Sequence, residues 1–231
     1  MRCATDETPR ISGNLERLWL LFFPRRCVWC GGVAEPKQMI CPDCEAEAAP
    51  KRLLPELIRD SQLPLVSVFG YHTQASRILL GVKYHDGRKN VHSIGYAMAD
   101  ALAEAGYTDK HAMFCAVPMT NRQMKARGFN QSELLAKSAA RWLGADYAPL
   151  LRKTRETQTQ HDLPAAQRQD NVTEAYDVAI PNKITGRCVV LCDDICTTGA
   201  TLRVCAAALE EAGAREVICL TFLRTELEEN E

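Results

Sequence analysis

The sequence predicts an α/β fold with a parallel sheet, preceded by a small module that contains four cysteines. Two observations lead to this fold class. Short, continuously apolar runs are separated by helical stretches of ten or more residues, which is typical of a parallel sheet covered on both faces. Residues 27–50 are instead rich in Cys, Gly, Pro and acidic residues, and are too short to bury a core of their own. We therefore expect an N-terminal module over 1–64 and an α/β domain over 65–231.

Strands of the α/β domain are expected where β-branched and apolar side chains run without interruption. These runs are 65–71, 112–117, 188–191 and 217–223. Helices are expected where apolar residues recur with the spacing of one helix face. The stripes are Ala75, Ile78, Leu79 and Val82; Val91, Ile94, Met98 and Leu102; Leu135, Ala139, Trp142 and Leu143; and Leu202, Cys205, Ala206 and Leu209. Asn130 is expected to cap the third of these helices in a capping box with Glu133.

The composition is that of an ordinary globular protein. Of the 231 residues, 46% are hydrophobic and 25% are charged, and the formal net charge is -1. No overall charge therefore indicates nucleic acid or an anionic membrane as a partner. The longest apolar runs fall far short of the roughly 20 residues of a membrane-spanning helix, and the early acids Asp6 and Glu7 do not fit a signal peptide. We expect a cytoplasmic protein without a membrane span.

Four of the eleven cysteines have the spacing of a metal site. Cys27, Cys30, Cys41 and Cys44 form two C-x2-C pairs that are separated by ten residues. Two such pairs can place four thiolates around one tetrahedral ion. We expect a structural zinc ion in a zinc-ribbon-like module, because four cysteine ligands leave no open coordination position for a substrate. An iron–sulfur cluster and four unrelated buried cysteines are the alternatives.

Residues 189–201 read VVLCDDICTTGAT and place an acid pair just before a turn that enters a helix. The backbone N–H groups of Thr197 to Thr201 can hold a phosphate at the helix N-terminus, and Gly199 has no Cβ to obstruct it. Asp193 and Asp194 can accept hydrogen bonds from vicinal hydroxyls or hold a divalent ion. The pattern favours a ribose phosphate. An ordinary turn with solvated acids is the alternative, and a P-loop nucleotidase is disfavoured because no Walker A motif occurs.

A second candidate segment, 117–136, reads VPMTNRQMKARGFNQSELLA. In a parallel sheet, the loop after this strand emerges at the same edge as the acid pair. Arg122, Lys125 and Arg127 can therefore face an anion such as pyrophosphate there. A basic turn exposed to solvent is the alternative. A long polar stretch at 152–171 has a length that is usually either functional or disordered.

These motifs together resemble known families. The segment 189–201 is similar to the phosphoribosyl pyrophosphate (PRPP) loop of type I phosphoribosyltransferases. With the cysteine pairs and the RGFNQ string, the chain resembles the ComF family of bacterial competence proteins, including GntX-type members. The resemblance implies a type I phosphoribosyltransferase-like domain that binds PRPP with Mg²⁺, with Asp193 and Asp194 as the catalytic pair and with 152–171 as a flexible hood. The implied substrate contacts are Pro118, Arg122, Arg127, Arg168, Thr197, Thr198, Gly199, Ala200 and Thr201.

Three hypotheses for function follow from the resemblance. The first is a phosphoribosyltransferase, whose acceptor is not identified because no base-binding motif is recognisable. The second is a non-catalytic PRPP sensor. The third is an accessory protein that handles single-stranded DNA beside the DNA-uptake machinery in natural transformation. Cys192 and Cys196 depart from the family pattern around the acid pair, and indicate either a redox-sensitive site or a local variation in packing.

Overall fold

Six strands form one sheet in the order β1-β2-β8-β7-β3-β4. The structure is a computed structural model, which describes residues 27–34, 40–48, 53–71, 73–83, 88–154 and 176–225. The strands are β1 (Glu56–Leu57), β2 (Pro64–Gly70), β3 (Met113–Ala116), β4 (Asp146–Tyr147), β7 (Cys188–Cys196) and β8 (Glu216–Arg224). Every neighbouring pair in this sheet is parallel except β1 with β2 at one edge. The parallel sheet predicted from the apolar runs is confirmed.

Side chains alternate between the two faces along the central strands, and two hydrophobic cores result. In β3, Phe114 and Ala116 belong to one core, whereas Met113 and Cys115 belong to the other. The strands β7 and β8 alternate in the same way. Because both faces are buried, these strands need apolar residues at successive positions, which explains why their sequences are continuously apolar.

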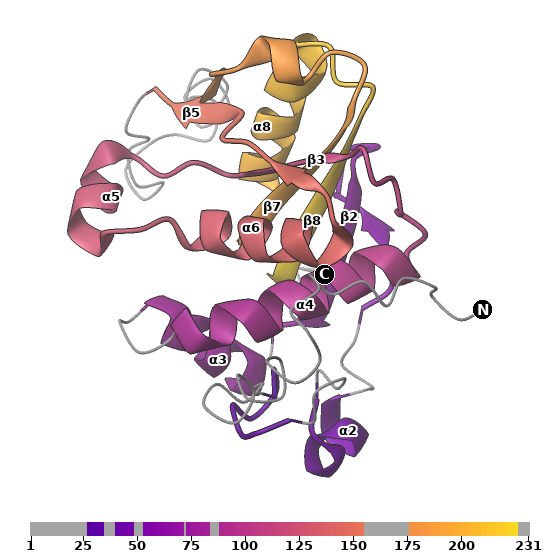
Figure 1. The fold of residues 1–231 in the computed structure, drawn as a ribbon, viewed down its shortest axis with the longest axis vertical. Coiled ribbons are helices and arrows are strands. Elements are labelled where there is room, and N and C mark those ends of the chain that lie inside the picture. The colour runs from indigo at the N-terminus through magenta and orange to yellow at the C-terminus, as the bar shows by residue number, and fades with distance from the viewer. Residues whose placement is uncertain are drawn as a thin grey trace, which may run out of the picture.

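Helices cover both faces of the sheet (Figure 1). The first core is formed with α3 (Thr73–Lys83), α4 (Arg88–Glu104) and α6 (Gln131–Leu143). The second is formed with α8 (Ala200–Glu211) and with a two-stranded ribbon of β5 (Leu151–Lys153) and β6 (Tyr176–Val178). The other described elements are α2 (Pro42–Ala48), α5 (Asn121–Arg127) and the 3-10 helix η3 (Pro181–Lys183). Among the helices that the structure describes, none is long and apolar enough to cross a bilayer.

The cysteine-rich segment packs on the first core through aromatic rings. Trp29 is fully buried, and its ring meets that of Phe69 in β2 edge to face, with the centroids 5.3 Å apart. Phe69 in turn meets Phe222 in β8 at 5.8 Å, again edge to face. The segment therefore shares buried apolar surface with the sheet, although the sequence alone indicated no core for it.

Two local expectations are wrong. Asn130 does cap α6, but its side chain accepts the N–H of Ser132, and the Glu133 carboxylate pairs with a lysine one turn later instead of completing a capping box. The capping box lies on α5, where the side chains of Thr120 and Gln123 each accept the backbone N–H of the other. The basic segment after β3, which was expected to be a loop, is therefore a capped helix.

Candidate functional site

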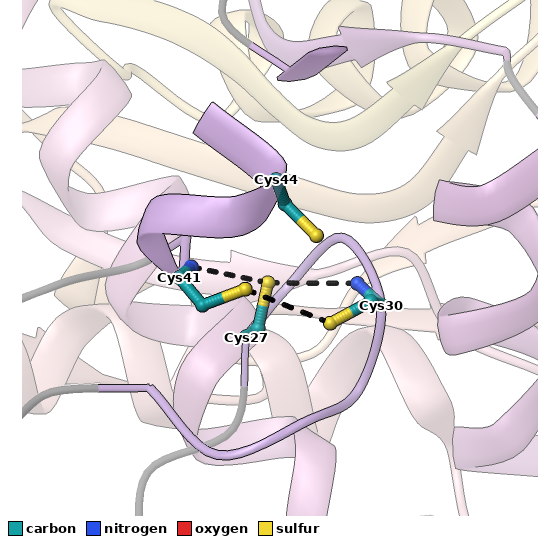
Figure 2. Close-up of side chains that lie close together, drawn as sticks. All are labelled: Cys27, Cys30, Cys41 and Cys44. Carbon is teal, nitrogen blue, oxygen red and sulfur yellow. Dashed lines mark hydrogen bonds between the residues drawn. The ribbon is translucent and has the colours of Figure 1, made fainter. Parts of the chain in front are cut away.

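Four sulfur atoms converge between the first cysteine pair and the start of α2. The Sγ atoms of Cys27, Cys30, Cys41 and Cys44 all lie within 4.8 Å of one another (Figure 2). Those of Cys30 and Cys41 are 3.8 Å apart. Four thiolates at a zinc–sulfur distance of about 2.3 Å would be separated by roughly 3.8 Å at the corners of a tetrahedron. The four side chains therefore fit a single tetrahedral ion, as their spacing predicts.

The backbone of the first pair is folded so that amides point at a sulfur atom. Gly31 has a φ of 75°, which lets the chain reverse there. The Sγ of Cys27 accepts backbone N–H groups from Trp29, Cys30 and Cys41 at 3.4, 3.5 and 3.3 Å. Burial raises the pKa of the Cys27 thiol, but the three donors outweigh it, and the pKa falls below its usual value. The backbone of this segment therefore favours the thiolate form of Cys27.

Two other thiols of the cluster lie where the surrounding protein disfavours their charged form. Burial raises the pKa of Cys30, and burial together with the neighbouring sulfurs raises the pKa of Cys44 well above its usual value. A bound cation would reverse this effect because it favours the charged thiolates. A four-sulfur donor set suits zinc, and a closed site leaves no position for a substrate.

The acid pair lies near the carboxyl end of a central strand. Because β7 continues through Asp193 and Asp194 to Cys196, both carboxylates are held on regular strand rather than on a loop. The Oδ1 of Asp193 accepts the hydroxyl of Ser132 at 2.7 Å and the N–H of Asp194 at 2.9 Å. Burial, and then the Asp194 charge, raise the pKa of Asp193 to about 7. A carboxyl group that titrates near neutral pH for a defined physical reason is a candidate functional group.

The turn after the acid pair leads directly into a helix. Thr197 and Thr198 are exposed, and α8 begins at Ala200 as predicted. The Oγ1 of Thr198 accepts the N–H of Ala200 at 3.3 Å. Gly199 has a φ of 76°, and a Cβ there would lie 2.4 Å from Cγ2 of Ile58. The missing Cβ is therefore needed for packing within the chain, a requirement that the sequence did not indicate.

The basic side chains that were expected near this edge lie on α5, which projects from the body of the molecule (Figure 1). Arg122 and Lys125 are exposed, and Arg127 is partly exposed. Pro118 is partly exposed in the connection from β3 to α5. The helix begins beyond the carboxyl end of β3, which lies parallel to β7, so it belongs to the same edge as the acid pair.

Comparison with known proteins identifies the family. The family described as phosphoribosyl transferase domain matches residues 130–230, from the N-cap of α6 to beyond β8. The DNA utilization protein YhgH of Salmonella typhimurium is 30% identical over 210 residues, which cover 86% of this chain and 90% of that protein. The chain belongs to the ComF/GntX family.

Two further relatives of this ComF-family chain are competence proteins. Competence protein ComFC of Bacillus subtilis is 27% identical over 202 residues, which cover 86% of this chain and 78% of ComFC. Competence protein F of Haemophilus influenzae is 33% identical over 103 residues, which cover 44% of this chain and 45% of that protein. Among solved structures, the allosteric regulatory enzyme of purine biosynthesis has 22% identity and a TM-score of 0.43. The match covers 62% of this chain and 30% of the enzyme's chain.

A ribbon beside the acid pair adds residues that sequence analysis of this ComF-family chain missed. In the pairing of β5 with β6, Lys153 lies opposite Tyr176, and its Nζ is 5.1 Å from the centroid of the tyrosine ring. The Tyr176 hydroxyl hydrogen bonds with the side chain of Thr201, and burial raises the pKa of Tyr176. The ribbon therefore contacts the first turn of α8. No local pattern reveals this contact, because the two strands are distant from α8 in sequence.

The hood expected at 152–171 falls mostly outside the described residues. Arg152 and Lys153 lie in β5, so these two residues of the expected hood belong to a strand. Arg168, the expected substrate contact of the hood, lies outside the part of the chain that the structure describes. Its role stays a prediction.

Six further cysteines are described, and all of them are buried. Burial raises the pKa of both Cys192 and Cys196, the two thiols that flank the acid pair. Cys196 is only 1% exposed. A buried thiol with a raised pKa reacts poorly with oxidants, so the geometry favours packing over redox sensing at these two positions. The six are Cys115, Cys188, Cys192, Cys196, Cys205 and Cys219.

Proposed function

We propose that this ComF-family protein binds PRPP with Mg²⁺ at the carboxyl edge of the sheet and transfers the phosphoribosyl group to an acceptor. The observation that carries the proposal is an acid pair on β7, followed five residues later by the N-cap Gly199 and then by α8. Ligands of parallel α/β sheets bind at this edge. The phosphoribosyl transferase domain match, which includes the acid pair and α8, supports the same conclusion.

Each part of the site has a task in this proposal. The N–H groups of Thr197 to Thr201 hold the 5-phosphate, while Asp193 and Asp194 accept hydrogen bonds from the ribose hydroxyls. Carboxylate and phosphate oxygens are the ligands that Mg²⁺ prefers, so the donor set fits this ion, which neutralises phosphate charge when bound. Arg122 and Arg127 of α5 contact the pyrophosphate group.

The reaction needs charge stabilisation rather than a protein nucleophile. As the bond between the anomeric carbon and pyrophosphate breaks, positive charge grows on the ribose and negative charge on the leaving group. The carboxylates of Asp193 and Asp194 stabilise the positive charge on the ribose, and the cations of α5 stabilise the negative charge on the pyrophosphate. The nearby thiols of Cys192 and Cys196 stay protonated because burial raises their pKa values, so they supply no competing nucleophile.

We also propose that the four-cysteine cluster holds one structural zinc ion and organises the N-terminal module, with the boundary to the α/β domain near residue 64. The sulfur geometry supports this assignment because it matches the tetrahedron that zinc prefers. The ion would fix the turn that carries Trp29 into the core shared with Phe69.

We further propose a role in DNA uptake, beside the uptake machinery. The names of the relatives, DNA utilization protein YhgH and competence protein ComFC, support it. On this chain, the exposed Arg122 and Lys125 of α5 offer contacts to the phosphates of single-stranded DNA. Phe129, the aromatic residue of this segment, is only 8% exposed and cannot serve as a stacking platform, so contact would be with phosphates rather than bases.

A thermal unfolding experiment tests the PRPP site. Mg²⁺ with PRPP should raise the melting temperature of the native protein, because a ligand that binds only the folded state stabilises it. Replacing both Asp193 and Asp194 by Asn should remove most of the shift, whereas Asp146→Asn, at an exposed carboxylate of β4, should leave it unchanged. The proposal fails if the double variant shifts as much as the native protein.

Pyrophosphate release distinguishes an enzyme from the non-catalytic PRPP sensor. Phosphorus NMR of the protein with Mg²⁺, PRPP and a panel of nucleobases and other amines should show free pyrophosphate appear with one of these acceptors. Thermal stabilisation by PRPP without release for any acceptor would assign the sensor role instead.

A further inference from the structure

Three successive carbonyl groups of the turn after β7 accept hydrogen bonds from the surrounding structure. The three donors belong to a residue of α8, to the last residue of β8 and to the residue that follows β8. The pairs are Cys196 O with the N–H of Thr225 at 2.9 Å, Thr197 O with Nη1 of Arg224, and Thr198 O with Nη1 of Arg203 at 3.3 Å. The direction of each peptide plane in the turn is thereby fixed.

This arrangement determines where the amides point. In a trans peptide, the carbonyl of one residue and the N–H of the next point in opposite directions. No cis peptide bond occurs among the described residues. With three carbonyls held by the protein, the N–H groups of Thr197, Thr198 and Gly199 point away from those hydrogen-bond donors, each within the plane of its own peptide. Successive amides before a helix N-terminus form a binding site for an anion.

We infer that Arg224 and Arg203 are positioning residues, which hold the turn carbonyls and thereby aim its amides at the 5-phosphate of PRPP. The inference rests on the proposed function, and it assigns to two arginines a role that differs from direct contact with the anion. It also explains why the carbonyl dipoles of Thr197 and Thr198, which would repel a phosphate, are paired with cationic side chains.

The guanidinium of Arg224 is committed to the protein. The residue is 9% exposed, and its Nε donates to Oε1 of Glu56 at 2.7 Å. Its Nη1 donates to the Thr197 carbonyl and lies 3.6 Å from Sγ of Cys196. Glu56 offsets the charge of Arg224, and the planar guanidinium spans two partners within the protein. The geometry therefore suits a side chain that holds the backbone in place rather than one that binds the substrate.

The segment that precedes β2 completes the support. Nη1 of Arg203 bridges the Thr198 carbonyl and the carbonyl of Arg59, the latter at 3.0 Å. Between Arg59 and Glu56 lies Ile58, whose side chain occupies the space that a Cβ on Gly199 would need. Residues 56–59 therefore pack against the turn at 197–199, although the sequence placed them in the N-terminal module, before the expected domain boundary at residue 64.

The test measures amide directions and ligand binding in matched variants. Arg224→Lys keeps the charge, but an ammonium group lacks the planar pair of donors that joins Glu56 to Thr197 O. Arg203→Met removes the second brace. The control is Arg187→Met, because Arg187 also holds a backbone carbonyl, that of His111 at 2.9 Å, but does so away from the turn. Residual dipolar couplings report N–H directions without ligand, and calorimetry with Mg²⁺ and PRPP reports affinity.

We expect the Thr198 N–H to reorient in Arg224→Lys and the Gly199 N–H to reorient in Arg203→Met, with PRPP affinity reduced about tenfold or more in each. Arg187→Met should change neither property. Unchanged N–H directions in both variants, or native affinity in Arg224→Lys, would overturn the inference. If the native protein binds no PRPP, the proposed function fails, and the dipolar couplings alone decide the positioning role. If Arg224→Lys does not fold, Arg203→Met carries the same test.

Discussion

Ser132 donates its hydroxyl to Oδ1 of Asp193 over 2.7 Å, and so joins the first turn of α6 to the acid pair on β7. The cap of the same helix is tied to β3, because Asn130 donates to the carbonyl of Val117 at 2.9 Å. The hydrogen bond from Ser132 favours the charged form of Asp193 and limits the rise of its pKa. The first turn of α6 and its N-cap thus link the connection between β3 and α5 with the carboxylate that we propose holds the ribose.

Ser132→Ala should weaken PRPP binding about 30-fold at pH 7, since a hydrogen bond to a charged group is worth on the order of 2 kcal/mol. The pH at which binding is half maximal should also rise, because the lost donor favoured the carboxylate. Calorimetry across pH 5 to 9 measures both effects. Ser138→Ala also removes a serine hydroxyl from α6, but this hydroxyl faces Gly95 of α4. The control should change neither the PRPP affinity nor the pH of half-maximal binding. Equal behaviour of the two variants would contradict the role of Ser132.

Asp193→Asn should stabilise the protein more at pH 8 than at pH 5. The folded protein keeps the Asp193 proton up to a pKa of about 7, whereas the unfolded chain loses it near pH 4. The contribution of Asp193 to the free energy of unfolding is therefore fully present below about pH 4, and it is lost as the pH rises through 7. Asn cannot ionise, so the variant avoids a cost of at most a few kcal/mol at pH 8. Urea unfolding at both pH values measures the difference. A variant that gains nothing at pH 8 relative to pH 5 would show that Asp193 ionises without cost.

Cys44→Ser should release one zinc ion per chain and lower the melting temperature of the whole protein. The effect should reach the sheet because Trp29 of the cysteine segment packs on Phe69, which packs on Phe222. Metal analysis and calorimetric unfolding give the two readouts. The control is Cys188→Ala, a buried cysteine outside the cluster, which should keep the metal. A protein that contains no zinc when it is purified without chelator would refute the assignment.

Gly199→Ala should destabilise the protein by about 2 kcal/mol or more. The new Cβ would meet Cγ2 of Ile58 at 2.4 Å, and the φ of 76° is costly for any residue with a Cβ. Gly186→Ala isolates the backbone part of the cost, since Gly186 has a φ of 71° with nothing within 4 Å of a Cβ. Urea unfolding should show a clearly smaller loss for Gly186→Ala. Equal losses would mean that Ile58 yields without cost and does not support the turn.

Local patterns predicted the parts of this structure that local interactions determine. The continuous apolar run of β7, the helix start at Ala200 and the paired spacing of the four cysteines are all visible in short windows, and the structure shows each of them. These features depend on side-chain burial, on helix capping and on ligand spacing, each of which acts over a few residues.

Contacts between distant segments were not predictable in this way. Ser132 and Asp193 are separated by 61 positions, and Arg224 and Glu56 by 168. Tyr176 reaches Thr201 only because β5 and β6 pair into a ribbon over α8. Each contact depends on the register of the sheet, which periodicity does not reveal. The capping box lies on α5 rather than on α6, because the side chain of Gln123, and not that of Glu133, accepts the backbone N–H of the N-cap residue.

A crystal structure of the protein soaked with PRPP and Mg²⁺ tests the central claim most directly. The account predicts electron density for the 5-phosphate within hydrogen-bond distance of the amides of Thr197 to Thr201, with the ribose hydroxyls at Asp193 and Asp194. Density for PRPP at another place, or an acid pair that remains without ligand while PRPP binds elsewhere, would contradict it.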